Sequence, residues 1–303
     1  MAFTLTILGS SSALPTSDRF TSAHILNVYE HLFLIDCGEG TQIRMRQNKI
    51  RFGKIDHIFI SHLHGDHFFG ILGLLSSFNI LGRKNPIHIY SFKGIEEIIN
   101  TSLKCSGQEF SYPIIYHNLD NDKSNLIYSD KRVEVISFPL NHRIPTCGFV
   151  FREKPKGRRI NKSALKEFNI PVSRLSEIKN GNDYITESGK IIKNELLTHA
   201  PDSLSSYAYC SDTLFNPDII PYINKVSLLY HEATFLEDMS ERAITTYHTT
   251  ARQAAEIAKA AYVQKLLIGH FSVRYKELDG FIQESRTIFE NTDLAFDGLQ
   301  ISF

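Results

Sequence analysis

One short stretch of the chain is unusually dense in side chains that bind metals. It runs from Ser61 to His67 and reads SHLHGDH. Four metal-binding groups this close together would compete for the same space unless a cation drew them in. A strand that continued to residue 64 would put His62 and His64 on one face, and a helix after the glycine would aim Asp66 and His67 at a neighbouring point. The motif predicts two metal ions, against the alternative of exposed loop histidines with no ligand role.

A ligand or acid–base side chain also follows four predicted strands elsewhere in the chain. The strands and the residues behind them are 132–138 with His142, 207–210 with Asp212, 226–230 with Glu232, and 266–269 with His270. Open sheets place functional groups in the loops outside their strand ends. The recurrence therefore indicates a single site built from distant segments.

These side chains form two sets of metal donors with one shared carboxylate. The imidazole set suits zinc, the second set mixes carboxylate and imidazole, and Asp212 is the natural bridge; the sets are His62, His64, His142 and Asp66, His67, His270. Two zinc ions about 4 Å apart hold a hydroxide near neutral pH and stabilise charge on phosphoryl oxygens. The donors therefore favour phosphodiester hydrolysis, with Asp66 orienting the water as general base.

An acid for the leaving group comes from two later motifs. His248 precedes a predicted helix at 250–262, in which Thr250 and Gln253 have capping-box spacing. If Glu232 holds the imidazole, the carboxylate raises the pKa of His248 and the ring can protonate the leaving alkoxide. A surface histidine without a role is the alternative.

The remaining pattern predicts antiparallel sheet first and then alternating strands and helices. Further strands are expected at 3–8, 23–28, 31–35, 58–60, 87–90, 112–117 and 126–129, with one or two more between 294 and 303. Further helices are expected at 41–49, 67–81, 94–103 and 277–290. Asp36 lies at the end of an early strand. It either holds the histidine-rich stretch from Ser61 to His67, the histidine loop, by hydrogen bonds or caps a turn.

Composition limits the classes of protein that this chain can be. Its 303 residues are 42% hydrophobic and carry 33 basic against 33 acidic side chains, so any polyanion site must be local. The four cysteines form no CxxC pair, which argues against a disulfide framework or a zinc ribbon. The amino terminus lacks the basic start of a signal peptide, and the longest apolar stretch, 68–81, is too short to span a bilayer. We therefore expect a cytoplasmic protein with no membrane partner.

Residues 152–193 differ from the rest of the chain. They hold eleven basic and five acidic residues, a net charge of +6, and are interrupted by prolines and glycines. Few of their apolar residues have the periodicity of a core element. The composition predicts a protruding arm, and the alternative is an ordinary solvated insertion.

The motifs together resemble the ribonuclease Z family of the metallo-β-lactamase superfamily. The superfamily order is the HLHGDH run, a later histidine, an aspartate and a final histidine. More specific matches are the stretches at Gly9–Thr16, Ser211–Thr213, His231–Phe235, His248–Ala251 and Gly269–Tyr275. The likeness extends from end to end, although residues 170–175 replace the usual glycine-proline-rich tip and Phe20 stands where asparagine is usual.

The resemblance implies an α/β protein with an αββα sandwich, made of a single domain of residues 1–303 into which residues 152–193 are inserted as a basic arm. It also implies a pair of zinc ions and a homodimer. It implies an endoribonuclease that removes the 3′ trailer from precursor transfer RNA, leaving a 3′-hydroxyl on the transfer RNA and a 5′-phosphate on the trailer. Asp66 corresponds to the proton acceptor, with Glu232 and His248 as its relay. No DNA partner is expected. RNA contacts are expected from basic residues of the arm and from one arginine of the final motif, namely Arg158, Arg159, Lys162, Lys166, Arg174, Lys179 and Arg274.

Two other functions fit parts of the pattern. A two-zinc phosphodiesterase or thioester hydrolase of small substrates would use the same donors, but a small molecule needs no basic arm. A non-catalytic RNA-binding protein could keep the fold, yet the donor positions are all filled by residues that bind metal.

Overall fold

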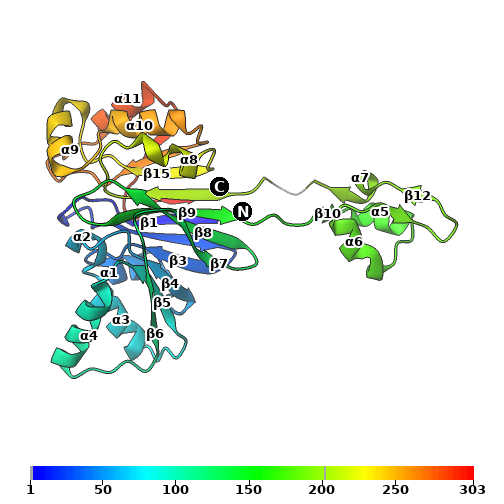
Figure 1. Cartoon of the computed structure of the whole chain (residues 1–303), viewed down its shortest axis with the longest axis horizontal. Helices are drawn as coiled ribbons and strands as arrows, with labels where there is room; N and C mark the ends of the chain where they lie inside the picture. The colour runs from blue at the N-terminus through cyan, green and yellow to red at the C-terminus, as the bar shows by residue number, and fades with distance from the viewer. Residues whose placement is uncertain (1–2, 201–202) are drawn as a thin grey trace. The chain divides into compact units, whose positions relative to one another are not determined.

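The computed structural model describes residues 3–200 and 203–303, which fall into two compact units (Figure 1). The main unit comprises 1–152 and 205–303, and the arm unit comprises 153–204. Most of the segment 152–193 singled out by its charge lies in the arm unit, which continues beyond it to residue 204.

The first sheet of the main unit combines antiparallel and parallel strands. Its spatial order is β18 (Gln300–Ser302), β1 (Phe3–Gly9), β2 (Ala23–Val28), β3 (His31–Ile35), β4 (Ile55–Phe59), β5 (Ile87–Ser91) and β6 (Ile114–Asn118). β1, β2 and β3 pair antiparallel, which confirms the predicted antiparallel start, and β3 to β6 run parallel. Because parallel strands share one carboxyl edge, the loops after β3 and β4 meet there.

The second sheet is built in the same mixed way. Its order is β17 (Thr292–Leu294), β16 (Leu266–Gly269), β15 (Leu228–Glu232), β14 (Ser206–Cys210), β9 (Thr146–Glu153), β8 (Val133–Leu140) and β7 (Asn125–Ser129). β14 to β17 run parallel, whereas β9 pairs antiparallel with β14. The loops after β14, β15 and β16 therefore leave from one edge.

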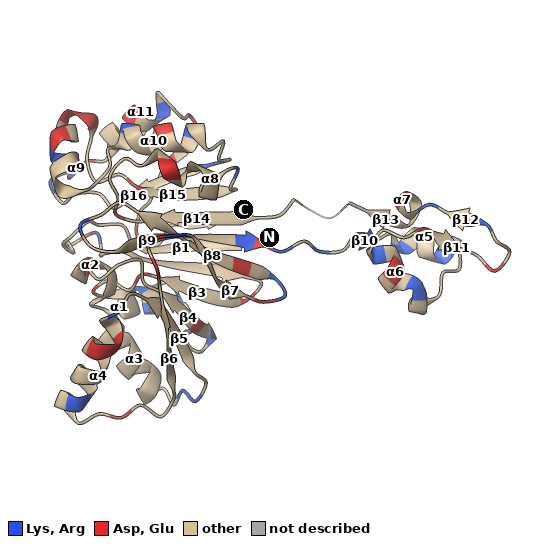
Figure 2. Ribbon diagram, viewed as in Figure 1, with Lys and Arg blue, Asp and Glu red and all other residues tan. Residues whose placement is uncertain are grey.

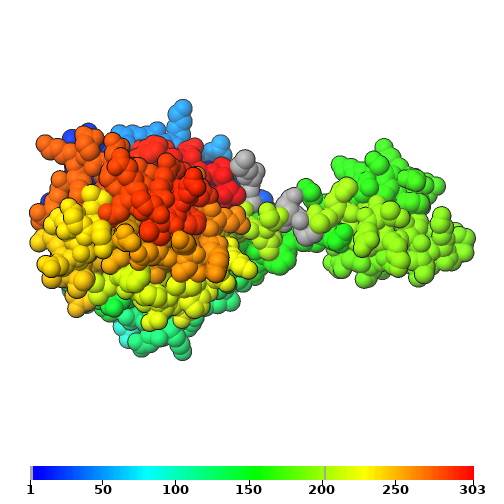
Figure 3. Space-filling view, turned by 90° about the horizontal axis from the view of Figure 1, so that it is seen from above, coloured from blue at the N-terminus to red at the C-terminus, as the bar shows by residue number. Residues whose placement is uncertain are grey.

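Three apolar layers hold the main unit together. Alternate residues of both sheets, such as Phe59 and Phe149, form the layer between the sheets. A second layer joins the first sheet to α1 (Thr41–Gln47), α3 (Ile71–Ile80) and α4 (Ile95–Ser106), and a third joins the second sheet to α10 (Ala251–Ala260) and α11 (Asp279–Arg286). In Figure 3 the orange and red surface of this carboxyl-terminal part covers one face. The predicted αββα sandwich is confirmed.

Several element boundaries differ from those predicted. β4 ends at Phe59, so His62 and His64 lie on an extended loop and not on a strand. The single helix predicted at 67–81 is two helices, α2 (Gly65–Phe68) and α3. β15 ends at Glu232, so that residue belongs to the strand itself. The remaining helices of this unit are α8 (Ile220–Ile223) and α9 (Ser240–Thr246), with 3₁₀ turns at Phe52–Lys54, Pro217–Ile219 and Glu237–Met239.

The arm unit has a small core of its own, which its sequence pattern did not suggest. Its elements are β10 (Arg159–Ile160), α5 (Lys162–Glu167), a 3₁₀ turn (Val172–Arg174), α6 (Leu175–Lys179), β11 (Tyr184–Ile185), β12 (Ile191–Ile192), α7 (Asn194–Leu197) and β13 (Thr198–His199). Ala164, Ile170, Ile178, Ile192 and Leu197 are buried together. These short elements contribute one or two apolar residues each, too few to produce a periodic signal. No helix in the described parts of the chain is long and apolar enough to cross a membrane.

A close crossing of two loops separates α2 from α3 and positions the histidine motif. The Gly70 N–H donates to the carbonyl oxygen of Cys37 at 2.9 Å. A Cβ at residue 70 would clash with the carbonyl oxygen of Gly38 and lie 2.9 Å from that of Cys37. Glycine is therefore required where the loop after β3 passes beneath the histidine motif.

We expect Gly70→Ala to lower the free energy of unfolding by about 1 to 3 kcal/mol, because a methyl group must push two backbones apart. Urea denaturation of the purified protein measures this change. Gly53→Ala is the matched control, since nothing lies within 4 Å of a Cβ at that position. Equal stability of the two variants would contradict the close crossing.

Candidate metal centre and active site

A single buried carboxylate, Asp212, lies between the two predicted donor sets. It follows β14 and its two oxygens face different groups of histidines. Oδ2 lies 3.7 Å from His62 Nε2 and 3.8 Å from His142 Nε2. Oδ1 lies 3.3 Å from both His67 Nε2 and His270 Nε2. Asp212 therefore connects the two donor sets, with one oxygen towards each.

The first donor set brings together three imidazoles from two loops. His64 Nδ1 lies 3.1 Å from His62 Nε2 and 3.1 Å from His142 Nε2. With Asp212, these ligand atoms all lie within 4.8 Å of one another. Three imidazoles and one carboxylate at this spacing match the ligand number and type of a tetrahedral zinc site.

The second donor set contains two imidazoles and two carboxylates. Asp66 Oδ2 lies 3.4 Å from His67 Nε2 and 3.4 Å from His270 Nε2, and the two histidine nitrogens are 3.3 Å apart. Asp212 completes this set within the same 4.8 Å limit. All seven residues predicted as metal ligands therefore converge in the folded chain.

Hydrogen bonds on the far side of the ring leave Nε2 for the cluster in four of the histidines, including His62, whose Nδ1 lies 3.1 Å from the Ser61 hydroxyl. The Nδ1–H of His67 donates to Asp36 at 2.7 Å, that of His142 to the carbonyl oxygen of Tyr247 at 2.9 Å, and that of His270 to Thr234 at 3.0 Å. Such partners select the tautomer whose Nε2 carries the lone pair. The rings are thus oriented for cation binding.

The electrostatics of the second set also suit a cation. Burial acts to lower the pKa of His67, but the carboxylates of Asp212, Asp66 and Asp36 outweigh it and hold that pKa well above its ordinary value. Buried carboxylates gathered around one imidazole are costly unless positive charge compensates them. The fold and this cluster together indicate a metal-binding site, and the donors fit a divalent ion.

Asp36 holds the histidine loop, which settles the two alternatives left by its sequence context. Its Oδ1 accepts the Ser61 N–H at 2.7 Å. Its Oδ2 accepts the hydroxyls of Ser61 at 2.9 Å and Tyr209 at 2.6 Å, in addition to His67. The prediction that Asp36 organises the loop by hydrogen bonds is confirmed.

The predicted pair of Glu232 and His248 lies beside the metal cluster. Glu232 is fully buried and its Oε1 accepts His248 Nδ1–H at 3.0 Å and the Thr249 N–H at 2.9 Å. Its Oε2 accepts the N–H and hydroxyl of Thr234 at 2.9 and 2.8 Å. The ring centroids of His248 and His270 are 5.5 Å apart, so the Glu232–His248 pair lies next to the second donor set.

The pair has the charge state that an acid requires. Burial acts to lower the pKa of His248, but the Glu232 carboxylate outweighs it and raises the pKa to about 9. Burial likewise acts to raise the pKa of Glu232, and His248 brings it below the ordinary value. An imidazolium whose Nδ1 is held by a carboxylate keeps its Nε2–H for a substrate atom.

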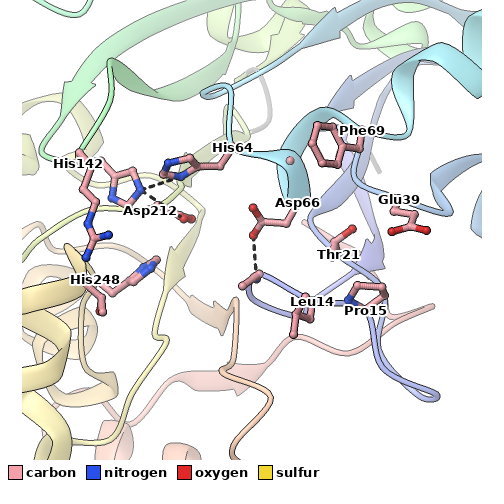
Figure 4. Close-up of a pocket in the computed structure, with 14 residues that line it drawn as sticks. Leu14, Pro15, Thr21, Glu39, His64, Asp66, Phe69, His142, Asp212 and His248 are labelled. Carbon is pink, nitrogen blue, oxygen red and sulfur yellow. Dashed lines mark hydrogen bonds and ion pairs between the residues drawn. The ribbon is translucent and has the colours of Figure 1, made fainter.

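The cluster opens into a cavity of about 540 Å³. Figure 4 shows Asp66 in its middle, His142, Asp212 and His248 on one side, and Phe69, Glu39 and Pro15 on the other. The Ala13 N–H donates to Asp66 Oδ2 at 2.8 Å, which fixes the loop before Pro15 against the donor set. The site is therefore accessible and larger than two ions need.

The residues predicted to contact RNA lie apart from the cluster in the chain. Six are in the arm unit, and Arg274 is an exposed loop residue after β16. With the observed bounds of 153–204, the arm carries ten basic and seven acidic residues, a net charge of +3. This net charge is lower than the +6 of residues 152–193, because the observed bounds exclude Arg152 and include Glu195 and Asp202.

Sequence reasoning assigned no role to several residues that orient the site. Ser61, Thr234 and Tyr247 each bind the outer nitrogen of a ligand histidine. Tyr209 reaches Asp36 from the second sheet. A signal was available only for Thr234, which lies within the HEAT motif two residues after Glu232. The others depend on pairs of residues that meet only in the fold.

Curated relatives resemble this chain over nearly its whole length. Ribonuclease Z of Bacteroides fragilis is 46% identical over 300 residues, covering 99% of both chains. Ribonuclease Z of Cytophaga hutchinsonii is 48% identical, covering 98% of this chain and 95% of the relative. The model of the family "Anti-Pycsar protein Apyc1" matches residues 3–121.

Solved structures agree with this likeness. The short form of human tRNase Z is 26% identical with a TM-score of 0.72, covering 99% of this chain and 98% of that one. The metallo-β-lactamase-fold protein YhfI from Bacillus subtilis, 17% identical with a TM-score of 0.69 over 99% of this chain and 98% of that one, shares the fold alone. On the identity of its curated relatives over nearly the full length, the chain belongs to the ribonuclease Z family.

Proposed function

We propose that this protein is a zinc-dependent endoribonuclease that removes the 3′ trailer from precursor transfer RNA. Cleavage near the discriminator base would leave a 3′-hydroxyl on the transfer RNA and a 5′-phosphate on the trailer. The observation that carries the proposal is the pair of donor sets that share Asp212, one oxygen each, in a chain with ribonuclease Z relatives.

The two donor sets would hold two zinc ions per chain, bridged by Asp212. Bound zinc would polarise the phosphate oxygens and lower the pKa of an attacking water towards about 7. Asp66, whose Oδ2 is held by the Ala13 N–H, lines the cavity and would accept a proton from that water. Its fixed position orients the water with respect to the phosphate.

His248 would protonate the leaving oxygen. Its imidazolium form is present at neutral pH, because its pKa of about 9 lies above that range. Glu232 engages Nδ1–H, so Nε2–H is the donor available to the 3′-oxygen of the transfer RNA. Bond cleavage then gives a 3′-hydroxyl, while the phosphate remains on the trailer.

The arm unit would bind the body of the transfer RNA through its phosphates. Several of its basic side chains form ion pairs within the unit, among them Lys156 with Glu153, Arg174 with Glu177, and Lys193 with Asp183. Lys162 and Lys166 are exposed on α5, where Figure 2 marks basic residues in blue. Because phosphate contacts carry no sequence information, such residues suit a substrate recognised by shape.

Assembly and location complete the proposal. A homodimer is expected from the family resemblance, and Ile80 and Leu81 at the end of α3 are exposed apolar side chains that a second copy would cover. All four cysteines are unpaired, as in proteins of a reducing compartment, which supports the cytoplasm.

The decisive experiment incubates the zinc-loaded protein with a precursor transfer RNA that carries a 3′ trailer and maps both product ends. We expect a cut at the base of the acceptor stem that leaves a 3′-hydroxyl. Asp66→Ala and His248→Ala should each slow cleavage at least about 10² to 10⁴-fold with RNA binding largely kept, because each removes a proton-transfer group. Asp66→Ala also removes a ligand of the second donor set, so its metal content is measured alongside. No cleavage by fully metallated protein would favour the small-substrate hydrolase.

We expect Asp212→Ala to hold fewer than two zinc ions per chain, because both sets lose a ligand. Elemental analysis after dialysis measures the metal, and circular dichroism checks the fold. Asp238→Ala, which removes an exposed carboxylate away from the donor sets, should keep both ions. Full occupancy in Asp212→Ala would show that this residue is not the bridge.

We expect the double change Lys162→Gln and Lys166→Gln to weaken transfer RNA binding uniformly and to reduce the salt slope of log K by about 1 for each lysine. Filter binding at several salt concentrations measures the slope. Lys84→Gln with Lys259→Gln alters two exposed lysines of the main unit and serves as the control. An unchanged slope in the arm variant, with unchanged affinity, would refute phosphate binding by α5.

A further inference from the structure

The two sides of the active-site cavity differ in chemistry. The side with His142 also includes the next residue in the chain, Arg143, whose guanidinium donates to the carbonyl oxygen of Thr245 at 2.7 Å. Among the described residues that line the cavity, Arg143 is the single lysine or arginine. The other side presents Leu14, Pro15 and Phe69 (Figure 4). One side therefore suits phosphates, and the other is largely apolar.

Phe69 lines the cavity, and its ring is largely exposed. It follows α2, and its N–H donates to the carbonyl oxygen of Gly65 at 2.9 Å. A Cβ on Gly65 would collide with the Phe69 ring, so the ring lies directly over this glycine, one residue before Asp66. The Phe68 ring packs edge-on against it, with the two ring centroids 4.9 Å apart. Despite these contacts, 66% of Phe69 remains exposed.

The backbone of Leu14 is held by hydrogen bonds on the same side. Its carbonyl oxygen accepts the Ser11 hydroxyl at 2.8 Å, and its N–H donates to the Ser12 carbonyl oxygen at 2.7 Å. The preceding Ala13 is bound to Asp66. Leu14 is nevertheless 60% exposed. Two exposed apolar side chains, on backbone segments held by hydrogen bonds beside a polar reaction centre, form a surface for a flat apolar group.

The expected reaction decides which group reaches this surface. His248 donates to the oxygen that leaves with the transfer RNA, so the 3′ end of the transfer RNA occupies the His248 side. The nucleotide that keeps the phosphate, the first of the trailer, continues towards the opposite side. Glu39, an exposed carboxylate there, repels phosphates. The base of that nucleotide, and not its backbone, fits against Phe69.

We propose that Phe69, supported by Leu14, is a stacking platform for the base of the first trailer nucleotide. The proposal rests on the proposed trailer-removing activity and assigns the apolar side of its cavity. Stacking on an aromatic ring tolerates every base, so the platform would position trailers without selecting their sequence. By fixing the first trailer nucleotide, which carries the scissile phosphate, Phe69 would also position that phosphate.

The test combines a change in the substrate with a change in the protein. Two precursor transfer RNAs are compared, one intact and one with an abasic residue at the first trailer position, by kcat/KM under identical zinc loading. The wild-type protein should cleave the abasic substrate about tenfold more slowly, as expected for one lost stacking contact. Phe69→Ala should cleave the intact substrate about tenfold more slowly than the wild type and no longer distinguish the two substrates. Phe69→Tyr, which keeps the aromatic face, should retain the difference between the two substrates.

Phe296→Ala is the matched control, because Phe296 is also exposed, at 56%, and does not line the cavity. It should retain the full difference between the two substrates. Equal cleavage of both substrates by the wild type would overturn the platform while leaving the activity in place. An equal slowing of both substrates in Phe69→Ala would also overturn it, because a loss of folding or assembly ignores the base. Failure of the wild type to cleave either RNA would instead refute the proposed function and this inference with it.

Discussion

The buried carboxylate of Asp36 is the contact on which the arrangement of the site depends. It joins three other segments, since it accepts hydrogen bonds from Ser61 in the loop after β4, from His67 on α2 and from Tyr209 on β14. Asp36 itself has a left-handed backbone, with φ of 55°, at the point where the chain leaves β3. An unpaired buried charge is strongly destabilising, so the turn at Asp36 is stable only when its carboxylate accepts these four hydrogen bonds. The edges of the two sheets are thereby tied together at the metal cluster.

This tie explains why donors from distant parts of the sequence converge. Parallel strands β3 and β4 deliver Asp36 and the histidine loop at one edge, and β14 and β16 deliver Asp212 and His270 at an edge of the second sheet. Asp212 then touches histidines from both sheets. A site at strand ends can vary its loops without disturbing the apolar layers, which is the usual separation of scaffold and chemistry in such folds.

The arm unit illustrates a different relation between charge and structure. Its own core of five buried apolar residues makes it a folded element, so its exposed lysines are displayed on a rigid surface. Its net charge is modest, and several cations are paired internally. Recognition by this unit would therefore depend on where α5 presents its lysines more than on overall attraction, since exposed charges are screened within about 8 to 10 Å at physiological salt.

By itself the sequence determined the donor types, the order of the motifs and most strands, because a metal site demands particular side chains and buried strands demand apolar runs. It also predicted the capping box at Thr250, which is a local interaction. Only the tertiary structure decided that Tyr209 reaches Asp36 from the second sheet, that Thr234 orients His270, and that Gly70 breaks the helix predicted at 67–81. Those features arise from contacts between segments far apart in the chain. Such contacts leave no periodic or compositional trace in a single sequence.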